Sequence, residues 1–235
     1  MAAKKAVEAQ PDQAGANFIK VPAFNFRTLV VTVRGVTPLI CHAFSQKLLR
    51  EMAEKRSTDE QAAPTAGSKK KRAPRKARDF QAEYESSLYP IDGKPDRYGF
   101  PAIGFKRGLV GATRQIDGLD MTIANRIIFV NAPYRSRGQG VVMIEGGKPK
   151  MREDMVRLQD IARNPDVRYR AEFTNWSATL EIEYNASMIE ESGILLLLRY
   201  AGKSEGIGEQ RPSARKAPGD FGQYDIDPKH LAKGA

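Results

Sequence analysis

Apolar and polar residues alternate most clearly near the start of the chain, in the sequence FRTLVVTVRGV at Phe26–Val36. A period of two, together with many β-branched residues, predicts a half-buried β-strand, and Pro38 ends the pattern. Residues 44–55 instead carry apolar side chains at three- and four-residue intervals, which predicts a helix with one buried face. We expect order to begin near Phe18, so residues 1–17 are interpreted as a mobile tail.

The same two periodicities continue along the rest of the chain. They predict helices over 79–88, 100–116 and 188–201, and strands over 126–131, 140–145, 166–173, 177–184 and 221–226. We expect the first two strands to form a hairpin across residues 132–139, and the next two to form a second hairpin around Thr174–Asn175. Gly202 is expected to end the last helix, because glycine suits the backbone conformation at helix ends.

Without insertions, the predicted order is strand, helix, strand, strand, helix, strand. This order is typical of the split βαβ, ferredoxin-like pattern that RNA-recognition folds share. We therefore predict one α+β domain over residues 18–227, with an antiparallel sheet and two helices. A large insertion is expected over 44–94, the hairpin 166–184 is placed before the second helix, and 228–235 is interpreted as a tail.

Composition adds a strong positive charge, since 38 Lys and Arg face 28 Asp and Glu and leave a net charge of +10 at pH 7. This balance favours a polyanionic partner, because each neutralised phosphate releases counterions. The alternatives are a merely soluble basic surface and an acidic protein partner. Seven of the ten residues Lys69–Arg78 are basic. We expect the segment 57–78 to be a disordered loop that adds affinity without specificity.

Cysteine and histidine are too scarce to suggest a metal site. Cys41 is the only cysteine, and His42 and His230 are far apart, so we expect no disulfide, no zinc or histidine-rich site and no cofactor. Residues 1–16 lack the apolar segment of a signal peptide, and the run Ile194–Leu198 is too short to cross a bilayer. The expectation is a soluble, cytoplasmic protein with no membrane partner.

Three segments together resemble a known family. Val33–Ile40 (VRGVTPLI) is a strand that runs into Pro-Leu, Phe100–Arg114 (FPAIGFKRGLVGATR) is a proline followed by a helix start with Gly, Lys and Arg, and Gly202–Ile226 is glycine-rich and leads into the last strand. In this order they resemble the RAMP superfamily of CRISPR-associated antiviral proteins, and look closest to the backbone subunits that polymerise along a guide RNA.

The resemblance covers about a third of the chain. It implies an RNA-recognition-type fold with insertions, and copies that assemble head to tail along a strand as a homo-oligomer or as subunits of a ribonucleoprotein. The chain departs from the family in being shorter than many members and in lacking a compact run of glycines. A remote, virus-encoded single-strand binder is therefore the alternative relative.

The glycine-rich segment 202–222, called the glycine loop below, is the first candidate binding site. Gly206 and Gly208 let the backbone approach a ligand and expose N–H groups. Three cations share the segment with them: Arg211, Arg215 and Lys216. A phosphate backbone could lie against this segment, and the alternative is a flexible connection between helix and strand.

Lys106 and Arg107 lie near the start of the predicted helix 100–116, and Arg114 follows further along it. Cations near a helix N-terminus oppose the helix dipole unless an anion binds there. We therefore expect a ligand phosphate at this helix start. Solvated surface charge is the alternative.

Two further groups combine aromatic and basic side chains. Tyr134, Arg135 and Arg137 occupy the turn 132–139, a composition that suits base stacking and phosphate binding as well as any exposed hairpin. Arg168 and Arg170 are expected on one face of their strand, where two like charges are tolerable beside a polyanion.

An active site is harder to find. His42 could act as the general base of a metal-independent ribonuclease, but a structural histidine is the favoured interpretation. The acidic residues are too scattered for a two-metal nuclease: Asp117, Asp120, Glu153 and Asp154. Trp176 is expected to be a buried hairpin anchor rather than a base platform.

The sequence therefore predicts a non-catalytic subunit that binds single-stranded nucleic acid, with RNA preferred. Two alternatives stay open. One is a ribonuclease centred on His42, and the other is a viral structural or assembly protein whose charge neutralises a genome or docks an acidic partner.

Overall fold

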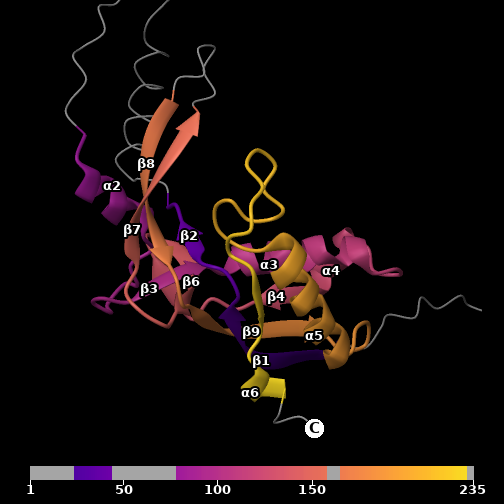
Figure 1. Cartoon of the computed structure of the whole chain (residues 1–235). Coiled ribbons are helices and arrows are strands. Elements are labelled where there is room, and N and C mark those ends of the chain that lie inside the picture. The colour runs from indigo at the N-terminus through magenta and orange to yellow at the C-terminus, as the bar shows by residue number, and fades with distance from the viewer. Residues whose placement is uncertain (1–23, 44–77, 158–164, 232–235) are drawn as a thin grey trace, which may run out of the picture.

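The structure is a computed structural model that describes residues 24–43, 78–157 and 165–231. The predicted tail 1–17, the helix 44–55 and all but the last residue of the loop 57–78 lie outside the described residues. Helices combine with antiparallel sheets, which confirms the α+β class (Figure 1).

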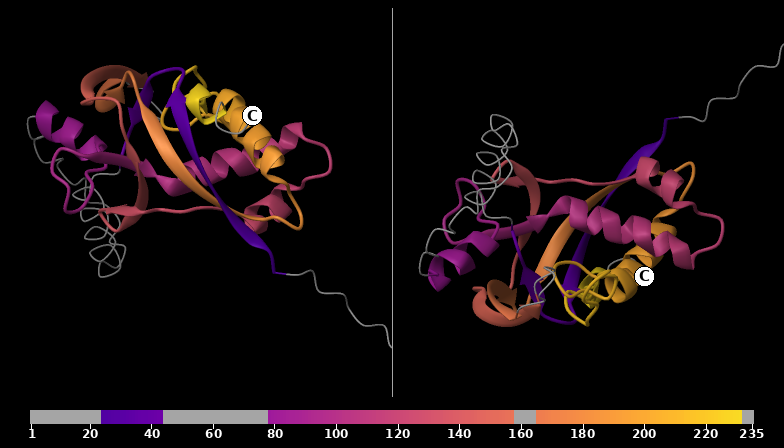
Figure 2. Two further views of the ribbon diagram at one scale, coloured as in Figure 1. Left: turned by 90° about the horizontal axis from the view of Figure 1, so that it is seen from below. Right: turned by 90° about the horizontal axis from the view of Figure 1, so that it is seen from above.

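Four antiparallel strands form the main sheet in the order β10, β1, β9, β4. Their bounds are Tyr224–Ile226 for β10, Phe26–Gly35 for β1, Ser177–Asn185 for β9 and Ile128–Val130 for β4. Helices α3 (Ala102–Ala112) and α5 (Glu191–Tyr200) lie across one face of this sheet, as the views from below and above show (Figure 2). Along the chain these elements follow the order β1, α3, β4, β9, α5, β10.

The alternation in β1 explains why the helices cover only that face. Leu29, Val31 and Val33 point into the core and are buried, whereas Thr28 and Val30 point outward and are exposed. Helix α5 contributes its apolar side to the same core, where Ile194, Leu197 and Leu198 are fully buried.

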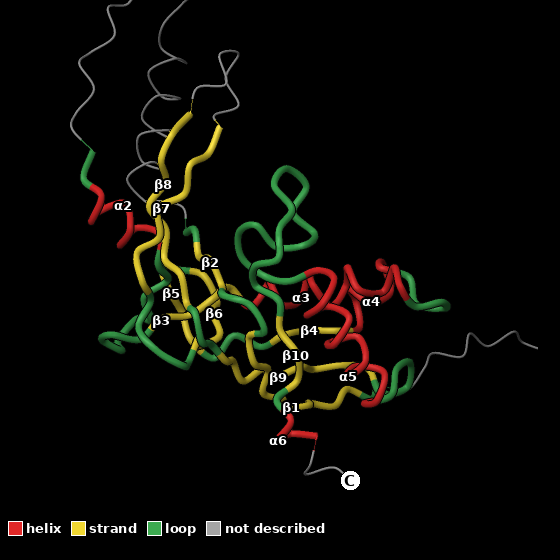
Figure 3. The backbone as a smooth tube through the Cα atoms, viewed as in Figure 1, coloured by secondary structure: helices red, strands yellow, loops and turns green. Residues whose placement is uncertain are grey.

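Two small sheets extend from the main sheet. One has the order β2, β8, β7, with bounds Leu39–Cys41, Pro165–Phe173 and Lys150–Arg157. The other has the order β3, β6, β5, with bounds Tyr98–Pro101, Gln139–Ile144 and Tyr134–Ser136. The paired strands β7 and β8, called the arm below, rise away from the main sheet beside helix α2 (Phe80–Ser87) (Figures 1 and 3).

Both predicted hairpins are wrong, although most of their strands exist. Strand β4 pairs with β9 rather than with β6, and the actual turn at Arg137–Gly138 joins β5 to β6. Strands β8 and β9 belong to different sheets. The third strand of the main sheet is therefore β9, not the predicted strand 140–145.

The junction between β8 and β9 explains this difference. Trp176 is buried, as expected, and its indole Nε1 donates to the carbonyl of Thr37 across 2.9 Å. Its own carbonyl accepts from the N–H of Gly35 at 2.8 Å. These bonds hold the segment between β8 and β9 beside the segment between β1 and β2. The chain therefore passes from one sheet to another at Thr174–Asn175, where the sequence resembles a tight turn.

The helix boundaries differ as well. Phe100 and Pro101 belong to β3, so α3 begins at Ala102, and a 3-10 turn over Thr113–Gln115 extends it. Gly202 does not end α5, because the chain continues as a π-helical turn over Ala201–Glu205.

The predicted helix 79–88 is confirmed as α2, which Asp79 caps by accepting from the N–H of Ala82. The sequence patterns missed β2, β3, β5, β7 and helix α4 (Met121–Ile127). The expected tail 228–235 begins with a short helix, α6 (Pro228–Leu231). Every helix in the described part of the chain is too short or too polar to span a bilayer.

Candidate nucleic-acid interface

A cleft of about 800 Å³ lies where the start of α3 faces the glycine loop. It is called the central cleft below. Lys106 and Arg107 line it from α3, and Gly206, Gly208 and Arg211 line it from the loop. Two segments that are about a hundred residues apart in the sequence, and that we had singled out separately, thus meet at one site.

The first turn of α3 forms one wall of the cleft. Pro101 stands at the N-cap, makes no capping hydrogen bond, and is followed by no acidic residue in the first turn. The helix end therefore keeps the partial positive charge of its N–H groups, which favours an anion. Arg107 is exposed, and burial lowers the pKa of Lys106.

The glycine loop forms the opposite wall. Gly206 and Gly208 have φ angles of +64° and +79°, a region that suits glycine. The N–H of Glu209 donates to the carbonyl of Ile40 at 3.0 Å, and Arg211 Nη1 donates to the carbonyl of Gly208 at 2.9 Å. Arg211 thus stabilises the backbone of the glycine loop itself. Arg215 and Lys216 are exposed on the outer part of the loop and do not line the cleft.

Two carboxylates interrupt the positive lining. Glu205 and Glu209 both line the cleft, and the carboxylate of Glu205 packs against the backbone of Gly111. Burial, with Glu205 nearby, raises the pKa of Tyr224, whose hydroxyl is buried without a hydrogen-bond partner among the described residues. Both acids stand beside the glycines in SEGIGEQR, so the sequence carries a signal for them next to the predicted site.

His42 also lines the cleft, and a hydrogen bond from the arm fixes its ring. Arg170 Nε donates to Nδ1 of His42 at 3.1 Å. Because Nδ1 accepts this bond, the neutral imidazole carries its proton on Nε2. Burial and the positive charge of Arg170 lower the pKa of His42, so the ring is neutral at pH 7.

Three arginines of the arm, Arg152, Arg168 and Arg170, form ion pairs. Arg170 is buried and lies 3.3 Å from Asp154, which also pairs with Arg152 at 2.7 Å. Arg152 bridges to Glu172 at 2.6 Å, and its guanidinium lies 4.5 Å from the ring of Phe221 in the glycine loop. The ion pairs therefore join β7 to β8, and the cation–π contact with Phe221 joins the arm to the loop.

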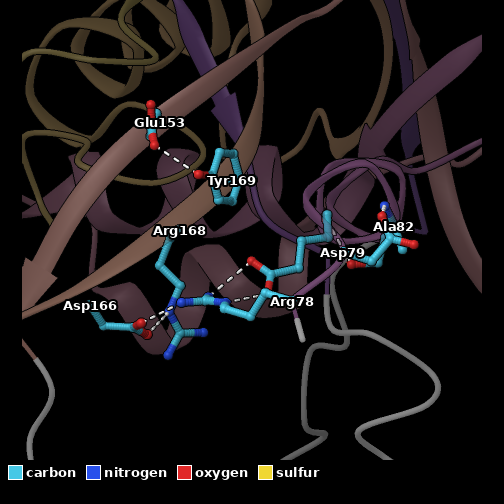
Figure 4. Close-up of polar contacts among 9 residues, drawn as sticks. Arg78, Asp79, Ala82, Glu153, Asp166, Arg168 and Tyr169 are labelled. Atoms are coloured by element: carbon cyan, nitrogen blue, oxygen red, sulfur yellow. Dashed lines mark hydrogen bonds and ion pairs between the residues drawn. The ribbon is translucent and has the colours of Figure 1, made fainter. Parts of the chain in front are cut away.

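A second ionic cluster lies further out on the arm (Figure 4). Arg168 pairs with Asp166 at 3.1 Å, and Arg78 donates to both Asp166 and Glu83. Arg168 and Arg170 therefore do have carboxylate partners, which compensate the like charges that we had assigned to a polyanion.

The remaining predicted site residues lie outside the central cleft. Arg137 donates to the carbonyls of Ser86 and Glu85 at the end of α2. Tyr134 makes a cation–π contact with Lys94, whose ammonium lies 4.3 Å from the ring centre. Arg135 is exposed. Arg114 lines a separate hollow formed by residues 113–123.

The sequence matches no protein family model, and no curated protein is similar to it at a significant level. Within the described ranges, no group of three or more His, Cys, Asp or Glu side chains is placed to hold a metal ion.

Proposed function

We propose that the chain is a non-catalytic subunit that binds single-stranded nucleic acid, with RNA preferred, through the central cleft. One observation carries the proposal: Lys106 and Arg107, in the second turn of α3, face the glycine loop across a single cleft. The N–H of Gly206 is already bonded to the carbonyl of Ala201 at 2.8 Å, and Gly206 is buried, so the expected display of N–H groups by this glycine is wrong. A helix start and two cations remain, a combination suited to phosphate groups.

The arrangement of the main sheet supports a ferredoxin-like fold with large insertions. Its strand order β10, β1, β9, β4, with α3 and α5 on one face, is the order in which such a split βαβ unit places its strands. The glycine loop also follows the last long helix, α5, and precedes β10. This placement supports the proposed RAMP-like ancestry and, with it, assembly along a strand.

Replacing Lys106 and Arg107 together by alanine tests the proposed function. We expect single-strand affinity to fall about tenfold or more at moderate salt. The slope of log affinity against log salt should also become shallower, by the amount expected for the loss of up to about two phosphate contacts. Fluorescence anisotropy with labelled single-stranded RNA, single-stranded DNA and duplex, each over a salt series, measures both quantities.

The matched control is Arg126→Ala with Lys148→Ala. Both side chains are exposed and neither lines the cleft, so this variant removes the same charge elsewhere. An equal loss in both double variants would reveal non-specific attraction and would contradict the cleft as the binding site.

The position of His42 in the cleft wall favours one second candidate, a metal-independent ribonuclease. That activity predicts cleavage of labelled RNA in EDTA that His42→Ala abolishes. The hydrogen bond from Arg170 weighs against it, because Nδ1 could take up a substrate proton only after this bond breaks.

A further inference from the structure

Three phenylalanines gather at one edge of the sheet face that the helices leave open. Phe26 begins β1 and Phe24 lies just before it, with ring centres 4.9 Å apart, and the ring of Phe26 lies 6.1 Å from that of Phe129 on β4. Phe24 is 89% exposed and Phe129 is 38% exposed. Large aromatic side chains exposed as a group are candidates for contact with a partner.

This aromatic group, called the phenylalanine edge, is continuous with the central cleft. The ammonium of Lys106 lies 4.3 Å from the ring centre of Phe129, and Lys106 itself lines the cleft. Val130, the residue after Phe129, lines the cleft too. A chain that leaves the cleft past Lys106 therefore meets Phe129 first and then Phe26 and Phe24.

The centre of the same open face is unsuited to a nucleic acid. Thr32 and Thr179 stand opposite each other there, and Glu181 is exposed beside them. Glu183 lies in the row between Thr28 and Phe129. These carboxylates repel phosphates, and Glu183 does so directly opposite Phe129, so the phosphates of a bound strand are kept on the cleft side of the sheet and only its bases reach the rings.

We propose that the phenylalanine edge stacks the unpaired bases of a single strand whose phosphates lie in the central cleft. The inference rests on the proposed function and adds what the cleft cannot supply, discrimination against duplexes. Phosphates are common to single strands and duplexes, whereas an aromatic ring can stack only on a base whose face is not already covered. Lys106 joins the two parts, since it neutralises a phosphate beside the ring of Phe129.

An abasic strand tests the proposal because it keeps every phosphate and has no bases. We expect wild-type protein to bind a short poly(dT) oligonucleotide about tenfold more tightly than an abasic oligonucleotide of the same length. The Phe129→Leu and Phe24→Leu/Phe26→Leu variants should reduce this ratio about threefold or more, and leave the salt dependence of binding unchanged.

Val30→Ala is the matched control, because Val30 is 52% exposed on the same face but lies away from the edge. It should keep the full ratio. Equal wild-type affinity for intact and abasic strands, with the salt dependence intact, would overturn the stacking proposal and leave the proposed function standing. Absence of salt-dependent binding to either strand would overturn both, and the wild-type comparison holds even if a variant fails to fold.

Discussion

Arg170 Nε donates to Nδ1 of His42 across 3.1 Å, from the middle of β8 to the residue that follows β2. The same guanidinium lies 3.3 Å from Asp154 on β7. A side chain in the wall of the central cleft is thus connected, through one arginine, to the buried ion pair of the arm. Arg170 therefore contacts both His42, whose protonation depends on pH, and Asp154, whose ion pair stabilises the arm.

The first prediction concerns pH. Burial and Arg170 lower the pKa of His42 from its ordinary value of 6.5, so below about pH 6.5 the unfolded chain takes up a proton that the folded protein does not. The free energy of unfolding should therefore fall as the pH drops from about 6.5 to the lowered pKa, and this contribution should be absent above about 6.5.

His42→Asn removes this titration, and its side-chain oxygen can still accept from Arg170. Urea unfolding between about pH 7.5 and pH 5 should show a smaller decline in the variant than in the wild type. His230 is common to both proteins and cancels. Parallel declines would show that His42 is not the group responsible.

The second prediction concerns the ion pair of the arm. Asp154→Ala leaves Arg170 buried without its carboxylate, which should cost about 3–5 kcal/mol. Arg170→Met should cost less, about 1–2 kcal/mol, because Asp154 keeps Arg152 at 2.7 Å. Chemical denaturation of both variants measures the difference, and a larger loss in Arg170→Met would contradict the assigned pairing.

The third prediction concerns the glycine loop. Alanine at Gly208 meets both a positive φ of +79° and the carbonyl of Ile40, with which its Cβ would collide. We expect a loss of about 2–3 kcal/mol, together with weaker single-strand binding.

Gly93→Ala is the control for the backbone contribution, because Gly93 has a φ of +74° but nothing within 4 Å of the added Cβ. It should cost about 1 kcal/mol and leave binding unchanged. Thermal melts compare the two, and equal losses would mean that the contact with Ile40 is unimportant.

Elements with a clear local period were predictable. Strands β1 and β9 and helix α5 carry their burial pattern in the sequence itself, so their existence was confirmed with small errors at the ends. Strand β7 was missed because its sequence KMREDMVR lacks apolar alternation. Its side toward the glycine loop is filled by Arg152 and Asp154, which pair with each other and also contact residues distant in the chain: Arg170, Glu172 and Phe221.

Strand pairing and the site itself could not be predicted from neighbouring residues in the sequence. Thr174–Asn175 has the composition of a hairpin turn, and only the distant partner Thr37 of Trp176 shows that the chain changes sheets there. Gly202 suggested a helix end, but its glycine is needed because a Cβ would collide with the carbonyl of Tyr224.

The two walls of the central cleft were recognised separately, since a single sequence does not say that Lys106 and Gly206 face each other. The phenylalanine edge was missed for the same reason, because Phe129 lies about a hundred residues from Phe24 and Phe26.

The position of Trp176 gives the molecule a built-in optical probe. It is the only tryptophan in the chain. It bonds to Thr37 and Gly35, where the segment that joins β1 to β2 lies beside the segment that joins β8 to β9, and both segments lead from the main sheet to the arm's sheet. Its emission spectrum therefore reports on this junction alone. A red shift on adding a ligand would signal that the two sheets separate there, without any label attached to the protein.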